Sequence, residues 1–219
     1  MSGFLSSSIA KKVAMALSAL FLIIFLIIHL SVNITSLFSE NLFNQLSHFM
    51  GTNPLIQFAL QPVLILGVVF HFVMGFVLEL KNKQSRGVPY AKYNAGAGAS
   101  WASRNMILSG AVILAFLILH FIDFWVPEIK HKYIEFLPED PNRYFGELQH
   151  KFVNPLRVGA YVIAFVLLAL HLLHGFQSAF QSMGFNNKYT PFIKSFGKFY
   201  SFAVPLGFII IALYHHFNH

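Results

Sequence analysis

Four histidines lie inside the most apolar stretches of this chain, at His29, His71, His120 and His171. An ionisable ring is costly in hydrocarbon, so histidines within membrane helices usually pair with one another or mark a functional site. A neutral imidazole offers a nitrogen lone pair, and it is a common ligand of transition metals and of haem iron. These residue types therefore predict metal or haem ligation inside a membrane, provided that the helices bring the histidines together.

The composition is that of an integral membrane protein. Of the 219 residues, 56% are hydrophobic and only 11% are charged, whereas a soluble domain carries about a quarter charged residues. The chain has no cysteine, which excludes disulfides, thiolate-bound iron–sulfur clusters and covalent haem attachment. Because no glycine-rich nucleotide fingerprint occurs either, flavin or nicotinamide chemistry would belong to another subunit.

Five apolar stretches are long enough to cross a bilayer, which takes about 20 helical residues. They cover residues 13–37, 55–80, 102–124, 155–181 and 196–217. We therefore expect a single domain over residues 1–219, an all-α bundle of five transmembrane helices.

The distribution of basic residues predicts how this bundle is oriented. Segments on one side of the spans are basic and nearly free of acids, which places the N-terminus in the cytoplasm. These basic residues are Lys11, Lys12, Lys81, Lys83, Arg86, Lys92, Arg104, Lys188, Lys194 and Lys198. The net charge of +7 is thus mostly a matter of topology, and it indicates no nucleic-acid partner.

Depth along the helices sorts the four histidines into two pairs. At ~1.5 Å per residue, His29 lies about 25 Å beyond Lys12, and His120 lies about as far beyond Arg104. His71 and His171 each lie about 15 Å from the inner boundary on the same scale. The spacing predicts an outer pair, His29 with His120, and an inner pair, His71 with His171. Two bis-histidine haems b, held without covalent bonds, would stack across the membrane.

A weak internal repeat supports the pairing. The sequence LIIH at 26–29 resembles LILH at 117–120, and His71 and His171 are each followed four residues later by a glycine. A glycine one turn beyond the ligand leaves room for a porphyrin edge. His174 lies on nearly the same helix face as His171 and remains the alternative fourth ligand.

The remaining histidines receive simpler interpretations. His215, His216 and His219 are expected at a solvated helix end, and His131 and His150 on the surface of the outer loop. His48 belongs to a short amphipathic stretch that we expect to lie along the outer surface.

Taken together, these motifs resemble a known family. HLSVN at 29–33 is followed by FN at 43–44 and HFM at 48–50, and the H-x-x-x-G signatures stand at His71 and His171. This pattern resembles the five-helix, di-haem cytochrome b (b558-type) anchor subunit of succinate:quinone oxidoreductase and fumarate reductase, also called complex II. The resemblance covers all five helices.

The resemblance implies a subunit of a bacterial cytoplasmic membrane complex. It would anchor the flavoprotein and iron–sulfur subunits to the cytoplasmic face and pass their electrons through the two haems to a quinone, by analogy menaquinone. The chain itself would have no succinate site. The direction of the reaction, succinate oxidation or fumarate reduction, stays open.

Three polar residues near the outer histidine pair are candidates for quinone binding. Quinone reduction needs a group that holds the carbonyls and groups that deliver protons. Asn33 lies one turn beyond His29, and Glu40 and His48 follow in the next loop. We expect the quinone beside these residues, although Asn33 could instead cap the helix and His48 pack the loop.

Two other functions would also place histidines in membrane helices. One is the quinone-linked cytochrome b anchor of a hydrogenase or a different dehydrogenase, against which the 29–33 and 43–50 segments argue. The other is a metal or proton-coupled transporter, which usually buries carboxylates at mid-membrane. Here Glu79 and Asp123 lie near helix ends. A visible spectrum separates the cytochromes from the transporter.

Overall fold

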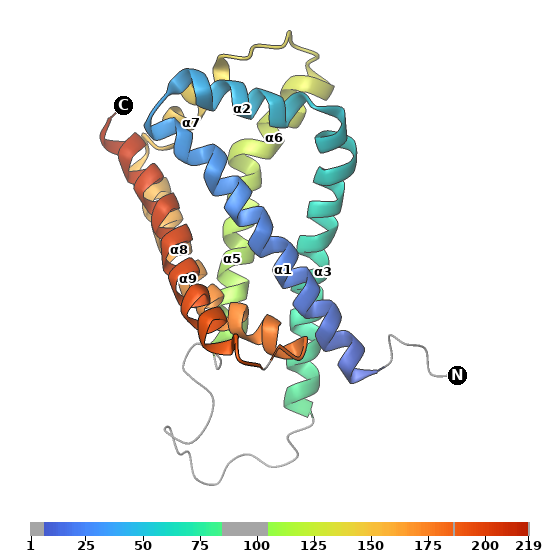
Figure 1. Ribbon diagram of the computed structural model, residues 1–219. Coiled ribbons are helices and arrows are strands. Elements are labelled where there is room, and N and C mark those ends of the chain that lie inside the picture. The colour runs from blue at the N-terminus through green and yellow to red at the C-terminus, as the bar shows by residue number, and fades with distance from the viewer. Residues whose placement is uncertain (1–6, 85–104, 186, 219) are drawn as a thin grey trace.

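The computed structural model describes residues 7–84, 105–185 and 187–218, and all of its regular elements there are helical (Figure 1). Five helical segments are long and apolar enough to cross a membrane. They cover Ile9–Leu37, Ile56–Lys81, Met106–Ile134, Pro155–Ser182 and Thr190–Phe217. The all-α bundle with five membrane-spanning helices is therefore confirmed, while the cytoplasmic N-terminus stays a prediction.

Each span is built from one long helix, in three cases extended by short turns of different pitch. The long helices are α1 (Ser8–Asn33), α3 (Gln61–Gln84), α5 (Met106–His120), α8 (Pro155–Ser182) and α9 (Thr190–Phe217). A 3₁₀ turn, η2 (Ile34–Leu37), extends α1, and a π turn, η3 (Ile56–Leu60), precedes α3. Beyond α5 the helix continues through η4 (Phe121–Trp125), α6 (Val126–Ile129) and η5 (Lys130–Ile134).

Three predicted helix boundaries are wrong. The first span was expected to begin at residue 13 but begins at Ile9. The third span was expected to end at residue 124 but continues to Ile134, because the π turns η4 and η5 on either side of α6 accommodate Pro127 within the helix. The fifth was expected to begin at residue 196 but begins at Thr190, with Pro191 in its first turn. Charged residues end an apolar stretch without ending the helix.

Four helices form a closed ring, and the fifth packs outside it. In the ring α1 contacts α3 and α8, and α5 contacts the same two helices, while α9 packs against α8 and α1. Figure 1 shows α8 and α9 side by side, with α3 on the opposite side of α1 and α5. The four predicted ligand histidines lie one on each helix of the ring.

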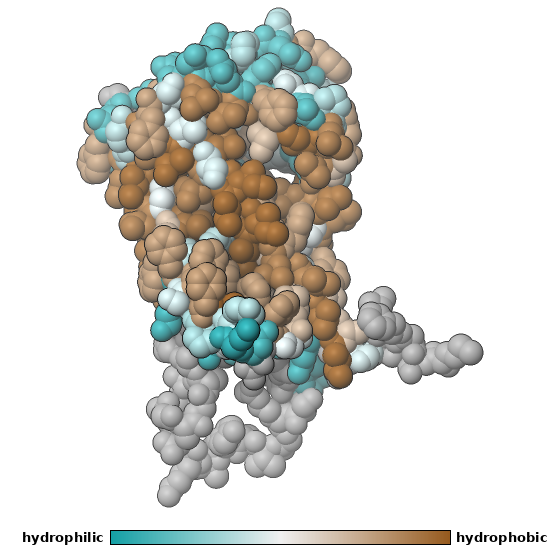
Figure 2. All heavy atoms as spheres, in the orientation of Figure 1, coloured by the Kyte–Doolittle hydropathy of each residue, from teal (hydrophilic) through white to brown (hydrophobic). Residues whose placement is uncertain are grey.

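Packing in the bundle is uneven. Between α8 and α9 the contact is close: Phe165 and Phe208 stack at 5.3 Å, and a Cβ on Gly197 would lie 2.5 Å from the ring of Phe176. By contrast, the described part of α3 has no fully buried residue. In Figure 2 an opening passes between apolar side chains just below the hydrophilic cap. The side chains of the ring therefore leave space inside it.

Two short helices cover the end of the bundle that we assign to the outer side. They are α2 (Glu40–Thr52) and α7 (Arg143–Lys151). The buried amide of Asn44 joins them, since it donates to Asn142 O at 3.2 Å and accepts from Phe145 N at 2.8 Å. The amphipathic stretch expected around His48 is thus a real helix, and Figure 1 shows α2 lying across the end of the bundle.

Candidate functional site

The outer histidines come from α1 and from the last residue of α5, and their rings are neighbours. The ring centroids of His29 and His120 are 5.8 Å apart and the ring planes are nearly perpendicular, at 87°. Phe25 stacks on His29 at 5.3 Å, and Phe208 contacts it from α9 at 5.5 Å. Aromatic rings therefore enclose this pair in an apolar environment.

The inner histidines are joined in the same way by the other two helices of the ring. His71 of α3 and His171 of α8 have ring centroids 6.3 Å apart and an interplanar angle of 68°. The ring facing His71 is that of His171, and in the described part of the chain no aromatic contact joins His71 to His174. The geometry therefore brings together the two pairs that helix depth predicts. Their role as ligands stays a prediction.

Both separations fit an iron atom held between two imidazoles. A metal–imidazole bond is about 2 Å long, so two in line place the nitrogens about 4 Å apart and the ring centroids about 6 Å apart. The observed separations of 5.8 and 6.3 Å lie close to that value. The separations therefore allow one iron atom between the two rings at each level.

Hydrogen bonds indicate which ring nitrogen of each inner histidine carries the proton and which keeps its lone pair. Ser18 donates its hydroxyl to Met15 O at 2.8 Å and lies 3.1 Å from Nδ1 of His71. Since the single hydroxyl proton is already used, Ser18 accepts from Nδ1–H of the histidine. The lone pair of His71 is therefore on Nε2, as a metal ligand requires.

His171 has the same arrangement. Ser109 of α5 donates to Met106 O at 2.9 Å, and its oxygen lies 3.2 Å from Nδ1 of His171. Neither serine was predicted from the sequence. A signal for them existed, because Met15 and Ser18 precede His29 with the same spacing as Met106 and Ser109 precede His120.

The outer histidines have different neighbours at Nδ1. Asn33 donates its amide to the backbone oxygen of His29 at 2.8 Å, and the same nitrogen lies 3.4 Å from His29 Nδ1. Nδ1 of His120 is buried and has no hydrogen-bond partner within the described residues. The two levels therefore differ in what surrounds Nδ1 of the histidines.

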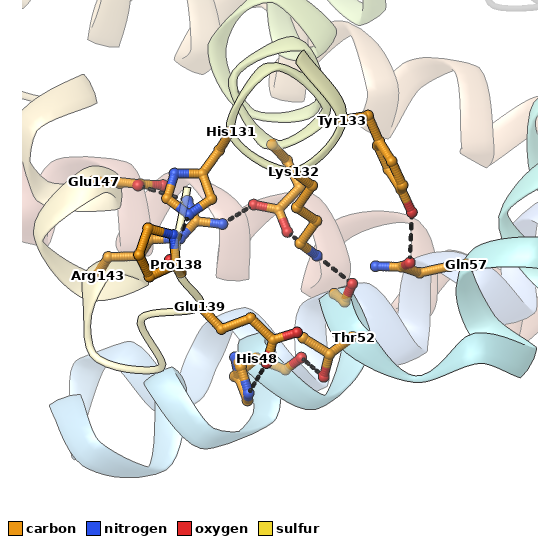
Figure 3. A network of polar contacts seen from close by, with 12 residues as sticks. His48, Thr52, Gln57, His131, Lys132, Tyr133, Pro138, Glu139, Arg143 and Glu147 are labelled. Atoms are coloured by element: carbon orange, nitrogen blue, oxygen red, sulfur yellow. Dashed lines mark hydrogen bonds and ion pairs between the residues drawn. The ribbon is translucent and has the colours of Figure 1, made fainter. Parts of the chain in front are cut away.

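The three predicted quinone residues do not form one cluster. Asn33 lies against His29, whereas Glu40 is the exposed first residue of α2. His48 Nε2 is 3.9 Å from a carboxylate oxygen of Glu139, and its ring is 6.1 Å from that of Tyr144 (Figure 3). The structure thus places Asn33 with the outer histidine pair and His48 with the polar cap.

A buried carboxylate near the outer pair was also missed. Asp123, in the π turn η4, is only 2% exposed; its Oδ2 accepts from the hydroxyl of Tyr161 at 2.9 Å and lies 3.3 Å from Nε of Arg157. The ring of Tyr161 is 6.2 Å from that of His120. Asp123 also lines an outer cavity of about 470 Å³ together with α7. The expectation that Asp123 lies near a helix end is wrong: the helical span continues to Ile134, so this carboxylate is buried inside the span.

The expectation for His215 is wrong. This histidine is 1% exposed, and its Nε2 lies 2.9 Å from the hydroxyl of Ser36. It is buried because η2 and α7 cover the end of α9, with Phe145 of α7 against its ring at 5.3 Å. His216 is partly buried and contacts Phe152 O at 2.8 Å, and His219 lies outside the described residues.

Ion pairs connect the elements of the outer cap (Figure 3). Glu128 pairs with Lys132 and with Arg143, and Lys132 also donates to the backbone oxygen of Gly51 in α2. These contacts join α2, α6, η5 and α7 above the outer histidine pair. Tyr144 lies in the same region, and its burial, with the nearby charge of Glu128, raises its pKa to about 12.

Comparisons with protein-family models, with curated proteins and with solved structures found no match. The class of this protein therefore rests on its fold and on the geometry of its histidines. This is an all-helical protein whose five longest helical segments can cross a membrane, and it holds four histidines in two facing pairs.

Proposed function

We propose that this chain is the membrane-anchor cytochrome b subunit of succinate:quinone oxidoreductase, which passes electrons from a cytoplasmic iron–sulfur subunit through two stacked haems b to a quinone, by analogy menaquinone. One observation carries the proposal: four histidines on four helices form two facing pairs at iron-ligand spacing. The resemblance of the 29–33 and 43–50 segments to the complex II anchor supports the choice among membrane cytochromes.

Bound haem would supply a one-electron carrier at each level. The paired histidines would fill both axial positions of the iron, which favours electron transfer over oxygen binding. Phe25, Phe208 and Phe116 pack around the outer rings and exclude water. Two levels divide a hydrocarbon core of about 30 Å into shorter electron-transfer steps.

The soluble partners belong, in this proposal, on the basic side of the membrane. Flavoprotein and iron–sulfur subunits would dock at the inner end of the bundle, where α3 ends and α9 begins. Lys81 and Lys198 lie in those two helices. Arg86, Lys92 and Arg104 were also predicted to contribute and lie outside the described residues.

A visible absorption spectrum tests the proposal most directly. We expect the purified protein to show a reduced b-type α-band and to contain two haems per chain. The complex isolated from membranes should contain a flavoprotein and an iron–sulfur protein. A chain purified with no haem under haem-replete expression would overturn the cytochrome assignment. Co-purification with a nickel or molybdenum enzyme would leave the cytochrome standing and replace the partner.

Quinone reduction is expected at the outer level. Asn33→Ala should lower quinone reduction at least tenfold while succinate still reduces both haems, because this amide lies against His29 and Asn33 is one turn nearer the outer end of α1. His48→Ala, further away in the cap, should have the smaller effect. The matched control is Asn41→Ala, which changes an exposed asparagine in α2. Normal quinone kinetics in the Asn33 variant would exclude this residue and favour a quinone site at the inner end.

A further inference from the structure

We propose that Ser18 and Ser109 are positioning residues that hold His71 and His171 in the iron-binding tautomer and lower the reduction potential of the inner haem. The inference rests on the proposed function, since it concerns the haem that this pair would ligate. It assigns a role to two residues of the neighbouring helices that are not ligands themselves.

The two serines occupy equivalent places in the fold. Ser18 lies on α1 and contacts a histidine of α3, and Ser109 lies on α5 and contacts a histidine of α8. Each follows a methionine by three residues and donates its proton to that methionine's carbonyl oxygen. Even the methionine side chains correspond, because a Cβ on Gly75 would contact Met15 and one on Gly175 would contact Met106. The same contact occurs twice in equivalent positions, which argues against incidental packing.

The chemical consequence follows from the direction of these hydrogen bonds. A serine oxygen that accepts from Nδ1–H draws that proton away from the ring and makes Nε2 a stronger electron donor. A stronger donor stabilises ferric iron relative to ferrous iron, so the reduction potential falls. The bond also keeps the proton on Nδ1 and prevents the tautomer in which Nε2 could not bind iron.

The outer pair provides an internal comparison. No serine hydroxyl contacts Nδ1 of His29 or His120 among the described residues: His29 faces the amide of Asn33, and His120 Nδ1 has no partner there. Removing Ser18 or Ser109 should therefore change the inner haem and leave the outer one as it was. A general loosening of the bundle would change both.

The test is a redox titration of Ser18→Ala and Ser109→Ala in the whole complex, with the inner haem identified from the loss seen in His71→Ala. Each serine variant should favour the reduced inner haem by about three- to tenfold, which is about 30–60 mV for one electron. The outer potential should stay unchanged. The matched control is Ser31→Ala, because Ser31 is an exposed residue of α1 whose hydroxyl bonds to Ile27 O.

If Ser18→Ala or Ser109→Ala removes the inner haem altogether, no potential can be measured, and the threonine variants provide the test instead. Ser18→Thr and Ser109→Thr keep a hydroxyl and should keep the haem at its original potential. If the threonine variants lose the haem as well, or if the alanine variants titrate like the parent, the serines do not tune this site. Neither result affects the cytochrome assignment, which fails if the parent protein binds no haem.

Discussion

His71→Ala is expected to eliminate the inner haem and to leave the outer haem bound, so that the haem content falls from two per chain to one. The inner iron would lose one of its two axial bonds, and the Ser18 oxygen would lose its hydrogen bond from Nδ1–H of His71. The outer pair uses different residues, on α1 and α5, and keeps its own aromatic surroundings. His171→Ala should have the same effect, because the two rings form one pair.

The reciprocal variants should lose the other haem. His29→Ala and His120→Ala are expected to remove the outer haem and to keep the inner one. Haem stoichiometry, read together with a redox titration, distinguishes the two losses. His174→Ala is the matched control on α8 and should retain both haems. If His174→Ala removes the inner haem while His171→Ala does not, the fourth ligand is His174 and our assignment is wrong.

The five spans and the pairing of the histidines follow from simple regularities of the sequence. An apolar stretch of about 20 residues has few alternatives to a membrane helix, because all backbone groups must be bonded internally in lipid. Rise per residue then converts sequence position into depth, which is why His29 meets His120 and His71 meets His171. Depth alone does not say which helices are adjacent, and that information comes from the ring of α1, α3, α5 and α8.

The polar contacts around the site are harder to predict, because they depend on rotation of each helix and on how its ends are covered. Ser18 and Ser109 look like ordinary small residues until α3 and α8 place a histidine beside them. His215 looks solvated until α7 covers it. Asn33 was placed correctly beside His29 because both lie on one helix, one turn apart. Contacts within one helix can be predicted from the sequence, whereas those between helices require the fold.

Glu128→Gln is expected to destabilise the outer cap by about 3 kcal/mol, at the lower end of the cost of breaking a buried ion pair. Glu128 lies between two cations that are themselves little exposed, Lys132 at 14% and Arg143 at 11%. Burial alone would lower the pKa of Arg143, but its bonds to Glu147 and Glu128 raise it above the ordinary value. The guanidinium therefore stays charged and loses a partner when the carboxylate is removed.

The loss should be concentrated at the outer end, where Lys132 also binds the backbone of α2. Limited proteolysis should cut the segments around α2 and α7 faster, and the thermal midpoint should fall. Glu135→Gln serves as the control: Glu135 forms an exposed pair with Lys130 at 2.9 Å, and such pairs contribute about 0–1 kcal/mol. Adding Arg143→Met to Glu128→Gln should restore part of the stability, because one of the two cations that Glu128 neutralised is then gone and only Lys132 stays without this partner. A Glu128 variant as stable as the Glu135 variant would show that the cap does not depend on this network, and that the outer histidine pair is enclosed by apolar packing alone.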